Sequence, residues 1–311
     1  MFRNKEYILA VYQEGGFTKA AERLFVSQPS LSASIKRIED KVGAPIFDRS
    51  SSPIALTEVG REYVKYALSI QEKEKDFSRY VSDHTNLLAG KIRIGGSSFF
   101  SSFVLPKLIS EFNEKHPQIQ FEIFEDSTKN LMSKLSAGNL DIIIDNAINE
   151  NENIVSEVFS SEILLLAVPK HLEINASLQN FAMTASDVKQ NKHFEQNLSV
   201  NLTLFKDYPF ILLNPENDTG KRAEKLFKKY GILPNVIFHL DQQVTAYNIS
   251  CSGMGISFVS DTLIKGIDNE RDVYYYRLPD LTAKRNIYFY QKKNHYLSLA
   301  SRKFIEYNTE N

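Results

Sequence analysis

The chain has 311 residues, of which 42% are hydrophobic and 24% are charged, and its formal net charge is −1. This length exceeds one comfortable core and predicts two or three domains, and the composition is that of an ordinary soluble globular protein. The near-zero charge excludes binding to a polyanion through bulk basicity, so any nucleic-acid contact depends on the placement of a few side chains.

Cysteine usage and the N-terminus bear on the compartment. Cys251 is the only cysteine, which excludes an internal disulfide and a CxxC redox pair and is typical of a small core residue. The N-terminus leads into an amphipathic helix that contains Glu6 and Glu14, with no signal-peptide core. No apolar run is long enough to span a bilayer, and we expect a cytoplasmic protein.

The first sixty residues predict three short helices and a hairpin. The first helix covers Lys5 to Glu14 and ends at Gly15 and Gly16. Thr18 is the expected cap of the second helix, and Ser27 caps the third, with Pro29 in its first turn. The third helix has an apolar face at helical spacing, formed by Leu31, Ile35, Ile38 and Val42.

The outer side of the third helix is small, polar and cationic. Such a surface suits insertion into the major groove of DNA, although many small helical domains also carry a polar face with two basic residues. The hairpin from Ile46 to Leu56 forms a wing in which Arg49 and the serines from Ser50 onward either meet phosphates or form a plain solvated turn. The outer residues of the helix are Gln28, Ser30, Ser32, Ala33, Lys36 and Arg37.

A long helix follows, from Glu58 to Leu88, with Thr57 as its cap. An apolar seam runs along it and includes Val59, Tyr63, Ala67, Ile70, Phe77, Val81 and Leu88. Packing against its own small domain accounts for only one end of the seam, so a second copy of the chain is the expected partner.

Alternating strands and helices after Gly90 predict an α/β domain. Two βα clusters, with late strands able to return to the first cluster, predict two lobes with a cleft between them. The segment from His171 to Asp207 is interpreted as loops around one or two short helices. Expected strands are 92–94, 119–125, 140–144, 163–168, 210–213, 236–240, 256–259, 274–278 and 287–291, and expected helices are 104–114, 129–137, 221–230, 244–252 and 298–307.

Three turns in this domain place hydroxyl or amide groups beside helix starts. They are Gly96 to Phe99, Ser127 to Thr128, and Asn217 to Gly220. Free N–H groups at such turns favour a small carboxylate or similar anion. The alternative is that Thr128 and Thr219 simply cap their helices.

Enzyme chemistry finds little support in the sequence. The six histidines are scattered without metal-ligand spacing, and GxSxG, P-loop and GxGxxG motifs are absent. Asp141 and Asp145 bracket a strand and are interpreted as structural. We expect no catalytic residues, no metal and no cofactor.

The sequence resembles the LysR-type transcriptional regulators along essentially its whole length. The specific part is FTKAAERLFVSQPSLSASIKRIEDKVGAPIFDR followed by LTEVG, with further matches at IRIG, VLPKLISEFNEKHP, GNLDIII and SGMGISFV. The resemblance implies an N-terminal winged helix-turn-helix, a long linker helix that dimerises, and a two-lobed α/β effector domain like type 2 periplasmic binding proteins. The implied domains are 1–60, 58–90 and 91–308, with lobe I at about 91–161 and 267–308 and lobe II at about 162–266.

The family also implies partners and site residues. Members bind operator DNA as homodimers or homotetramers and change DNA bending when a small inducer enters the cleft, and RNA polymerase is a further expected partner. The implied DNA contacts are Gln28, Pro29, Ser30, Ser32, Ala33, Lys36 and Arg49, to which the pattern adds Arg37 and Ser50. The expected effector contacts are Ser97, Ser98, Phe99, Thr128, Asn214 and Thr219.

Four departures from the family pattern bear on specificity. Ala33 and Ser34 stand where Arg-Gln is frequent, and Ser50 to Ser52 replace a basic residue after Arg49. Phe99 replaces a residue that is often small or hydroxylated, and the segment 171–207 is longer than usual. The main alternative function is a solute-binding protein without a regulatory role, and an α/β enzyme with a helical arm is a third.

Overall fold

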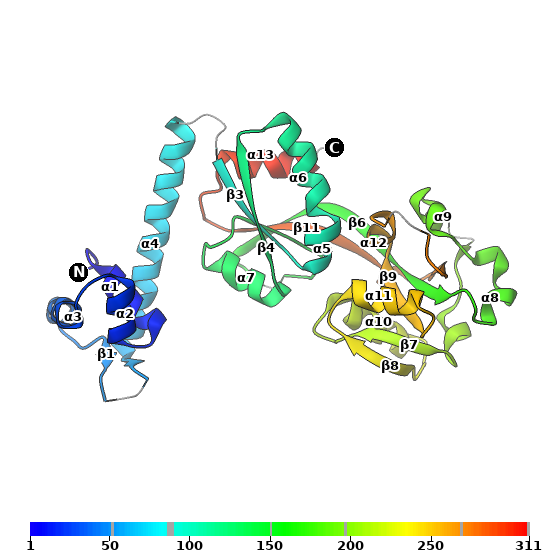
Figure 1. Ribbon diagram of the computed structural model, residues 1–311, viewed down its shortest axis with the longest axis horizontal. Helices are drawn as coiled ribbons and strands as arrows, with labels where there is room; N and C mark the ends of the chain where they lie inside the picture. Colours follow the sequence, from blue (N-terminus) through cyan, green and yellow to red (C-terminus); the bar gives the residue numbers. More distant parts are fainter. Residues whose placement is uncertain (51–52, 86–89, 150, 196–197, 268–269, 310–311) are drawn as a thin grey trace. The chain divides into compact units, whose positions relative to one another are not determined.

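The computed structural model describes residues 1–50, 53–85, 90–149, 151–195, 198–267 and 270–309. The chain divides into two compact units, Met1–Ser82 and Asp83–Asn311, which are described separately. Figure 1 shows the elements of both.

The first unit is a small helical domain with a two-stranded wing. It contains α1 (Lys5–Glu14), α2 (Phe17–Arg23), α3 (Gln28–Val42) and the antiparallel strands β1 (Phe47–Asp48) and β2 (Ala55–Leu56). The first part of α4 (Glu58–Thr85) completes its core. Fully buried core side chains come from each helix and include Ile8, Ala20, Leu31, Ile35 and Ala67.

Helix caps in this unit follow the sequence with one exception. Ser27 accepts a hydrogen bond from the Ser30 N–H, and the Thr57 hydroxyl accepts one from the Gly60 N–H. The prediction that Thr18 caps α2 is wrong, because Gly16 occupies the cap position and its carbonyl already accepts from the Ala20 N–H. Thr18 therefore lies inside the first helical turn.

The apolar seam of α4 is buried where it meets the first unit, at Tyr63 and Ala67, and exposed further along. Tyr63 and Ala67 lie in the core of the first unit, whereas 67% of Phe77 is exposed. Val59 and Val81 are also exposed, and the predicted end of this helix at 86–88 lies outside the described residues.

The second unit begins with a lobe built on five adjacent strands, in the order β4-β3-β5-β11-β6. Its helices α6 (Leu105–Lys115) and α13 (Leu299–Thr309) contribute to the core on one side of the sheet, and α7 (Thr128–Ser136) packs on the other side. Consecutive residues of β5 reach both cores, because side chains alternate across a strand. Four strands of this lobe are β3 (Gly90–Gly96), β4 (Ile119–Glu125), β5 (Ile142–Asp145) and β11 (Lys284–Lys292), and the fifth is the first half of β6.

The second lobe continues the same sheet through the far half of β6 (Ile154–Pro169). There β6 pairs with β9 (Ile256–Ser260) and β10 (Val273–Arg277), and β9 continues to β7 (Pro209–Leu213) and β8 (Asn235–Leu240). Helix α10 (Asp218–Lys229) contributes to one core of this lobe, and α11 (Gln243–Cys251) packs on β9 and β7.

Two strands connect the lobes. β6 is more than twice as long as expected, because it pairs with β11 along 154–163 and then with β9 and β10 along 164–169. The return to the first lobe lies between β10 and β11, later than the expected boundary at 266, because Val273–Arg277 pair with β6 in the second lobe. In Figure 1 both β6 and β11 are seen to pass from one lobe towards the other.

Several short helices have no counterpart among the expected elements. Ser98–Phe103 form α5 instead of an open turn, and Asp261–Lys265 form α12 directly after β9. The described residues of the segment 171–207 hold five short helices instead of one or two: Ile174–Ser177 (α8), Gln179–Phe181 (η1), Ala185–Lys189 (α9), Lys192–Phe194 (η2) and Leu202–Phe205 (η4). Their apolar residues are spaced too irregularly to reveal such short elements.

Candidate functional site

The outward face of α3 presents the polar side chains singled out from the sequence. Gln28, Pro29, Ser30, Ala33 and Lys36 are all exposed, because the opposite face of the helix is anchored in the core. Ser32 is half-buried, so it reaches solvent less freely than its neighbours. The leading end of the helix and its exposed side thus form one continuous polar surface.

The two arginines near this face are partly engaged. Arg37 donates to the Ala33 carbonyl and the Ser34 hydroxyl on its own helix. Arg49 donates to Glu39 at 3.2 Å and stacks over the Phe17 ring at 5.2 Å. Both arginines remain exposed, so each can exchange these surface contacts for a phosphate.

Glu39 ties the wing to α3. One of its carboxylate oxygens accepts hydrogen bonds from the Ile46 and Phe47 N–H groups at 2.8 and 3.2 Å, and the other accepts from Arg49. Ser50 is turned onto the Asp48 carboxylate, to which both its N–H and its hydroxyl donate. The wing is therefore held at a defined distance from the polar face of the helix.

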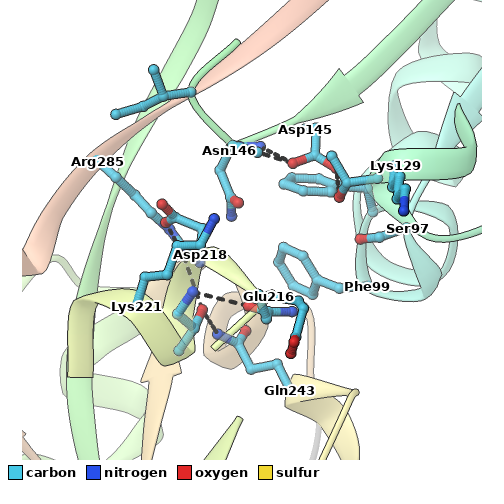
Figure 2. Close-up of a pocket in the computed structure, with 16 residues that line it drawn as sticks. Ser97, Phe99, Lys129, Asp145, Asn146, Glu216, Asp218, Lys221, Gln243 and Arg285 are labelled. Carbon is cyan, nitrogen blue, oxygen red and sulfur yellow. Dashed lines mark hydrogen bonds and ion pairs between the residues drawn. The ribbon is translucent and has the colours of Figure 1, made fainter. Parts of the chain in front are cut away.

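A cleft of about 280 Å³ lies between the lobes of the second unit. The first lobe lines it from β5 and from the starts of α5 and α7, and the second lobe lines it from the starts of α10 and α11. Figure 2 shows Asp145, Asn146 and Lys129 across the cleft from Glu216, Lys221 and Gln243. This volume suits a small organic molecule.

Four of the six expected effector contacts line this cleft, namely Ser97, Phe99, Thr128 and Thr219. Ser98 and Asn214 are not among its lining residues. Asn214 is held elsewhere, since its side chain donates to Asp241 and its N–H bonds to the Leu240 carbonyl at the end of β8.

The two threonines are not helix caps. Ser127 and Asn217 take the cap positions of α7 and α10, so the alternative interpretation of Thr128 and Thr219 as caps is wrong. A Cβ at Gly220 would meet the Asn214 carbonyl oxygen at 2.4 Å, so only glycine lets the first turn of α10 approach the end of β7 this closely. This approach brings the Thr219 hydroxyl to the cleft.

Asp145 is a buried carboxylate of the first lobe that lines the cleft. It accepts hydrogen bonds from the Thr128 hydroxyl and from the Asn146 and Ala147 N–H groups, each at 2.8 Å. Burial raises its pKa, and these hydrogen bonds only partly oppose that effect. Of the acidic pair interpreted as structural, Asp141 fits that role because it forms a two-pronged pair with Arg93, whereas Asp145 lines the cleft.

Arg285 is the main residue that sequence reasoning missed. It lies on β11, is 4% exposed, and donates to Glu162 at 2.6 Å, Asp218 at 2.8 Å and the Thr219 hydroxyl at 2.9 Å. Burial disfavours its charge, but the two carboxylates outweigh burial and raise its pKa. A lone arginine in an apolar strand is the only sequence signal, and it does not reveal partners 67 and 123 residues away.

The described residues show no other site with evident chemistry. They hold no group of three His, Cys, Asp or Glu side chains that could bind a metal. Burial raises the pKa of Cys251, which lies next to Tyr247 and is not an activated thiol. None of the described helices is long and apolar enough to cross a membrane.

Comparison with family models covers both units. Residues 2–61 match the model of the bacterial regulatory helix-turn-helix protein, lysR family. Residues 85–311 match the LysR substrate binding domain.

Individual relatives span most or nearly all of the chain. An uncharacterized HTH-type transcriptional regulator, YcgK of Bacillus subtilis (strain 168), is 25% identical over 305 residues, which are 98% of this chain and 93% of the relative. A probable RuBisCO transcriptional regulator of Trieres chinensis is 28% identical over 262 residues, or 82% of this chain and 79% of the relative.

Solved structures agree on the fold. A full-length OxyR variant from Pseudomonas aeruginosa is similar with a TM-score of 0.68 and 22% identity, covering 100% of this chain and 93% of the other. Full-length CbnR complexed with its target DNA is similar with a TM-score of 0.62 and 19% identity, covering 100% and 99%. The predicted fold class, a helix-turn-helix domain followed by a two-lobed α/β domain, is thereby confirmed.

Proposed function

This chain belongs to the LysR family of bacterial helix-turn-helix regulators, and we propose that a small molecule with an anionic group, bound in the cleft, controls how it binds DNA. It is a DNA-binding transcriptional regulator with an effector-binding domain. The relatives named above are regulators, which favours this function over that of a solute-binding protein without a regulatory role. No catalytic step is part of the proposal.

The DNA contacts in this proposal come from α3 and the wing. Gln28, Ser30 and Ser32 lie towards the leading end of α3, where side chains of such a helix reach base edges. Lys36 forms no ion pair within the described residues, and Arg49 lies next to it on the wing, so both are available to phosphates. Pro29, Ala33, Arg37 and Ser50 complete the interface.

Dimerisation through α4 is the second part of the proposal. Its exposed apolar residues, with 58% of Tyr66 and 67% of Phe77 accessible, form a surface that a second copy of the chain would bury. Two recognition helices would then read half-sites about 34 Å apart or a multiple of that distance. We assign residues 1–60 to DNA binding, 58–90 to dimerisation and 91–308 to effector binding, in homodimers or homotetramers that act in the cytoplasm and contact RNA polymerase.

The cleft supports an anionic effector because cations and helix starts meet at its mouth. Lys129 stands in the first turn of α7 and Lys221 in that of α10, on opposite lobes. Helix N-termini carry unsatisfied N–H groups and a favourable dipole for negative charge. An acid group between the lobes would draw both lysines together.

Switching requires that the effector prefer one arrangement of the lobes. Moving a two-state balance from mostly off to mostly on takes about 5.5 kcal/mol of differential affinity, which several subunits can share. A ligand that contacts Thr128 on one lobe and Thr219 on the other at the same time can make both contacts in only one arrangement of the lobes.

A gel-shift titration with the DNA upstream of the protein's own gene tests this function. We expect saturable binding of that fragment and at least about tenfold weaker binding of a scrambled fragment. Lys36→Ala should weaken binding to both fragments. The matched control Lys41→Ala, which removes an exposed lysine at the far end of α3, should change the affinity for either fragment little. Equal affinity for the two fragments would favour a solute-binding protein without a regulatory role.

The cleft is tested separately with Thr128→Val. This change removes the hydroxyl that donates to Asp145 and should abolish the response to effector, while binding to the upstream DNA stays intact. A Thr128→Val protein that responds at unchanged effector concentration would remove Thr128 from the site.

A further inference from the structure

The inner wall of the cleft and the layer behind it hold more carboxylates than guanidinium groups. Asp145 and Asp218 line the cleft, and Glu162 is buried behind the lining. Arg285 pairs with Glu162 and Asp218, and Arg222 pairs with Asp218. The two arginines compensate Glu162 and Asp218, whereas Asp145 forms no ion pair within the described residues. A buried charge without a partner is costly, so the wall favours a cationic group from outside.

Arg285 cannot serve as the main partner of an acidic ligand. Its guanidinium already binds Glu162 and Asp218 and donates to the Thr219 hydroxyl. An anion placed here would meet three nearby carboxylates, including Asp145, and like charges at such distances repel.

Two carboxylate groups keep acceptor capacity. Glu162 is fully buried, and its Oε2 has no hydrogen-bond partner among the described residues, although its Oε1 accepts from Arg285 and Asn146. Asp145 accepts three hydrogen bonds, whereas a carboxylate has about four acceptor positions. The Thr128 proton is donated to Asp145, so this hydroxyl offers only lone pairs to the cleft.

The mouth of the cleft carries two lysines and one exposed carboxylate, Glu216. Lys129 and Lys221 are exposed, line the cleft from opposite lobes, and form no side-chain ion pair within the described residues. Phe99 and Phe100 add an apolar wall near the start of α5. Figure 2 shows Lys129 and Asp145 on the same side of the cleft, and of the two Lys129 is exposed whereas Asp145 is buried.

We propose that the cleft binds a small zwitterion of the amino-acid type, with its ammonium group against Asp145 and its carboxylate between Lys129 and Lys221. This inference rests on the proposed function, because it names the effector of the same cleft. The apolar wall formed by Phe99 and Phe100 would take the ligand's side chain, and the cleft volume of about 280 Å³ limits the ligand to a small molecule.

Thermal unfolding of the full-length protein with each standard L-amino acid tests the proposal. We expect at least one amino acid to raise the melting temperature saturably, because a ligand that binds only the folded state stabilises it. Its α-hydroxy acid, which lacks the ammonium group, and its α-amide, which lacks the acid, should each bind at least about tenfold more weakly.

Two variants localise the charges. Asp145→Asn should weaken binding of the amino acid at least about tenfold and reduce the difference in affinity between the amino acid and the α-hydroxy acid. Asp126→Asn, which changes a carboxylate outside the cleft lining, should leave the affinities of both ligands unchanged. Lys129→Ala changes an exposed residue, so we expect the protein to stay folded. It should weaken the amino acid but not its amide.

Specific outcomes would overturn the proposal. It fails if no standard amino acid gives a saturable shift, or if the α-hydroxy acid binds as well as the amino acid. It also fails if Lys129→Ala weakens the amide as much as the amino acid. In each case the gel-shift result on the upstream DNA still decides the regulatory function independently, so failure of the ligand class is distinguishable from failure of the function.

Discussion

Replacing Arg285 with methionine should destabilise the second unit strongly. Among the described residues, the change deletes the only cation that contacts Glu162, which is fully buried, and leaves that carboxylate with Asn146 as its remaining partner. The Asp218 carboxylate is less affected, because Arg222 still binds it at 2.7 Å.

The expected loss of stability comes mainly from Glu162, which keeps no cationic partner among the described residues. Removing one partner of a buried ion pair costs about 3–5 kcal/mol, since an uncompensated charge remains. Solvent screening hardly reduces this free-energy cost here, because the Arg285 and Glu162 side chains are 2% and 0% exposed. Arg93→Met is the contrast, since the side chain of Arg93 is 21% exposed and its loss should cost less.

Urea unfolding combined with hydrogen-exchange mass spectrometry measures this effect. The free energy of opening should fall most in β6 and β11, which carry Glu162 and Arg285. Adding Glu162→Gln to Arg285→Met should recover more than half of the loss, because the stranded charge is gone. A loss below about 1 kcal/mol, or a double variant as unstable as the single one, would refute the reasoning.

Three further predictions concern other regions. Lys36→Ala should flatten the slope of log affinity against log salt by about one unit on every DNA sequence, and an unchanged slope would remove Lys36 from the phosphate contacts. Gln28→Ala should cost about 1–3 kcal/mol on the cognate site and little on scrambled DNA, so equal losses would contradict base contact. Burial would raise the pKa of Asp261, but hydrogen bonds from His193, the Ile163 N–H and Lys265 lower this pKa overall. The contribution of Asp261 to the stability of the fold is therefore complete above the unfolded pKa of about 3.8, and it is lost as pH falls through the lower folded pKa. The gap in unfolding free energy between the native protein and Asp261→Asn should therefore shrink on acidification, and a constant gap would argue against this linkage.

Local sequence signals are sufficient for elements that show their own periodicity and ends. The strand 119–125 is predicted with its observed bounds, because apolar and polar residues alternate between a polar loop and a capped helix. Ser27 and Thr57 are identifiable as caps because an N-cap bond joins residues only three apart.

Predictions fail where long-range pairing decides the structure. β6 extends to Ile154 because β11, more than a hundred residues later, pairs along it, and the exposed residues of that half carry no strand pattern of their own. The same lack of a local signal hides α5, whose run of Ser and Phe residues looks like a loop.

The sequence by itself determined the family, the order of the main elements and which turns approach the cleft, because those depend on residues close together in the chain. Only the tertiary structure decided how the cleft is charged. Asp145, Glu162, Asp218 and Arg285 come from four separate elements, and the energy of a buried charge depends on partners within a few ångströms, whatever their separation in sequence. The balance of charge on the inner wall is therefore a property of the folded lobes alone.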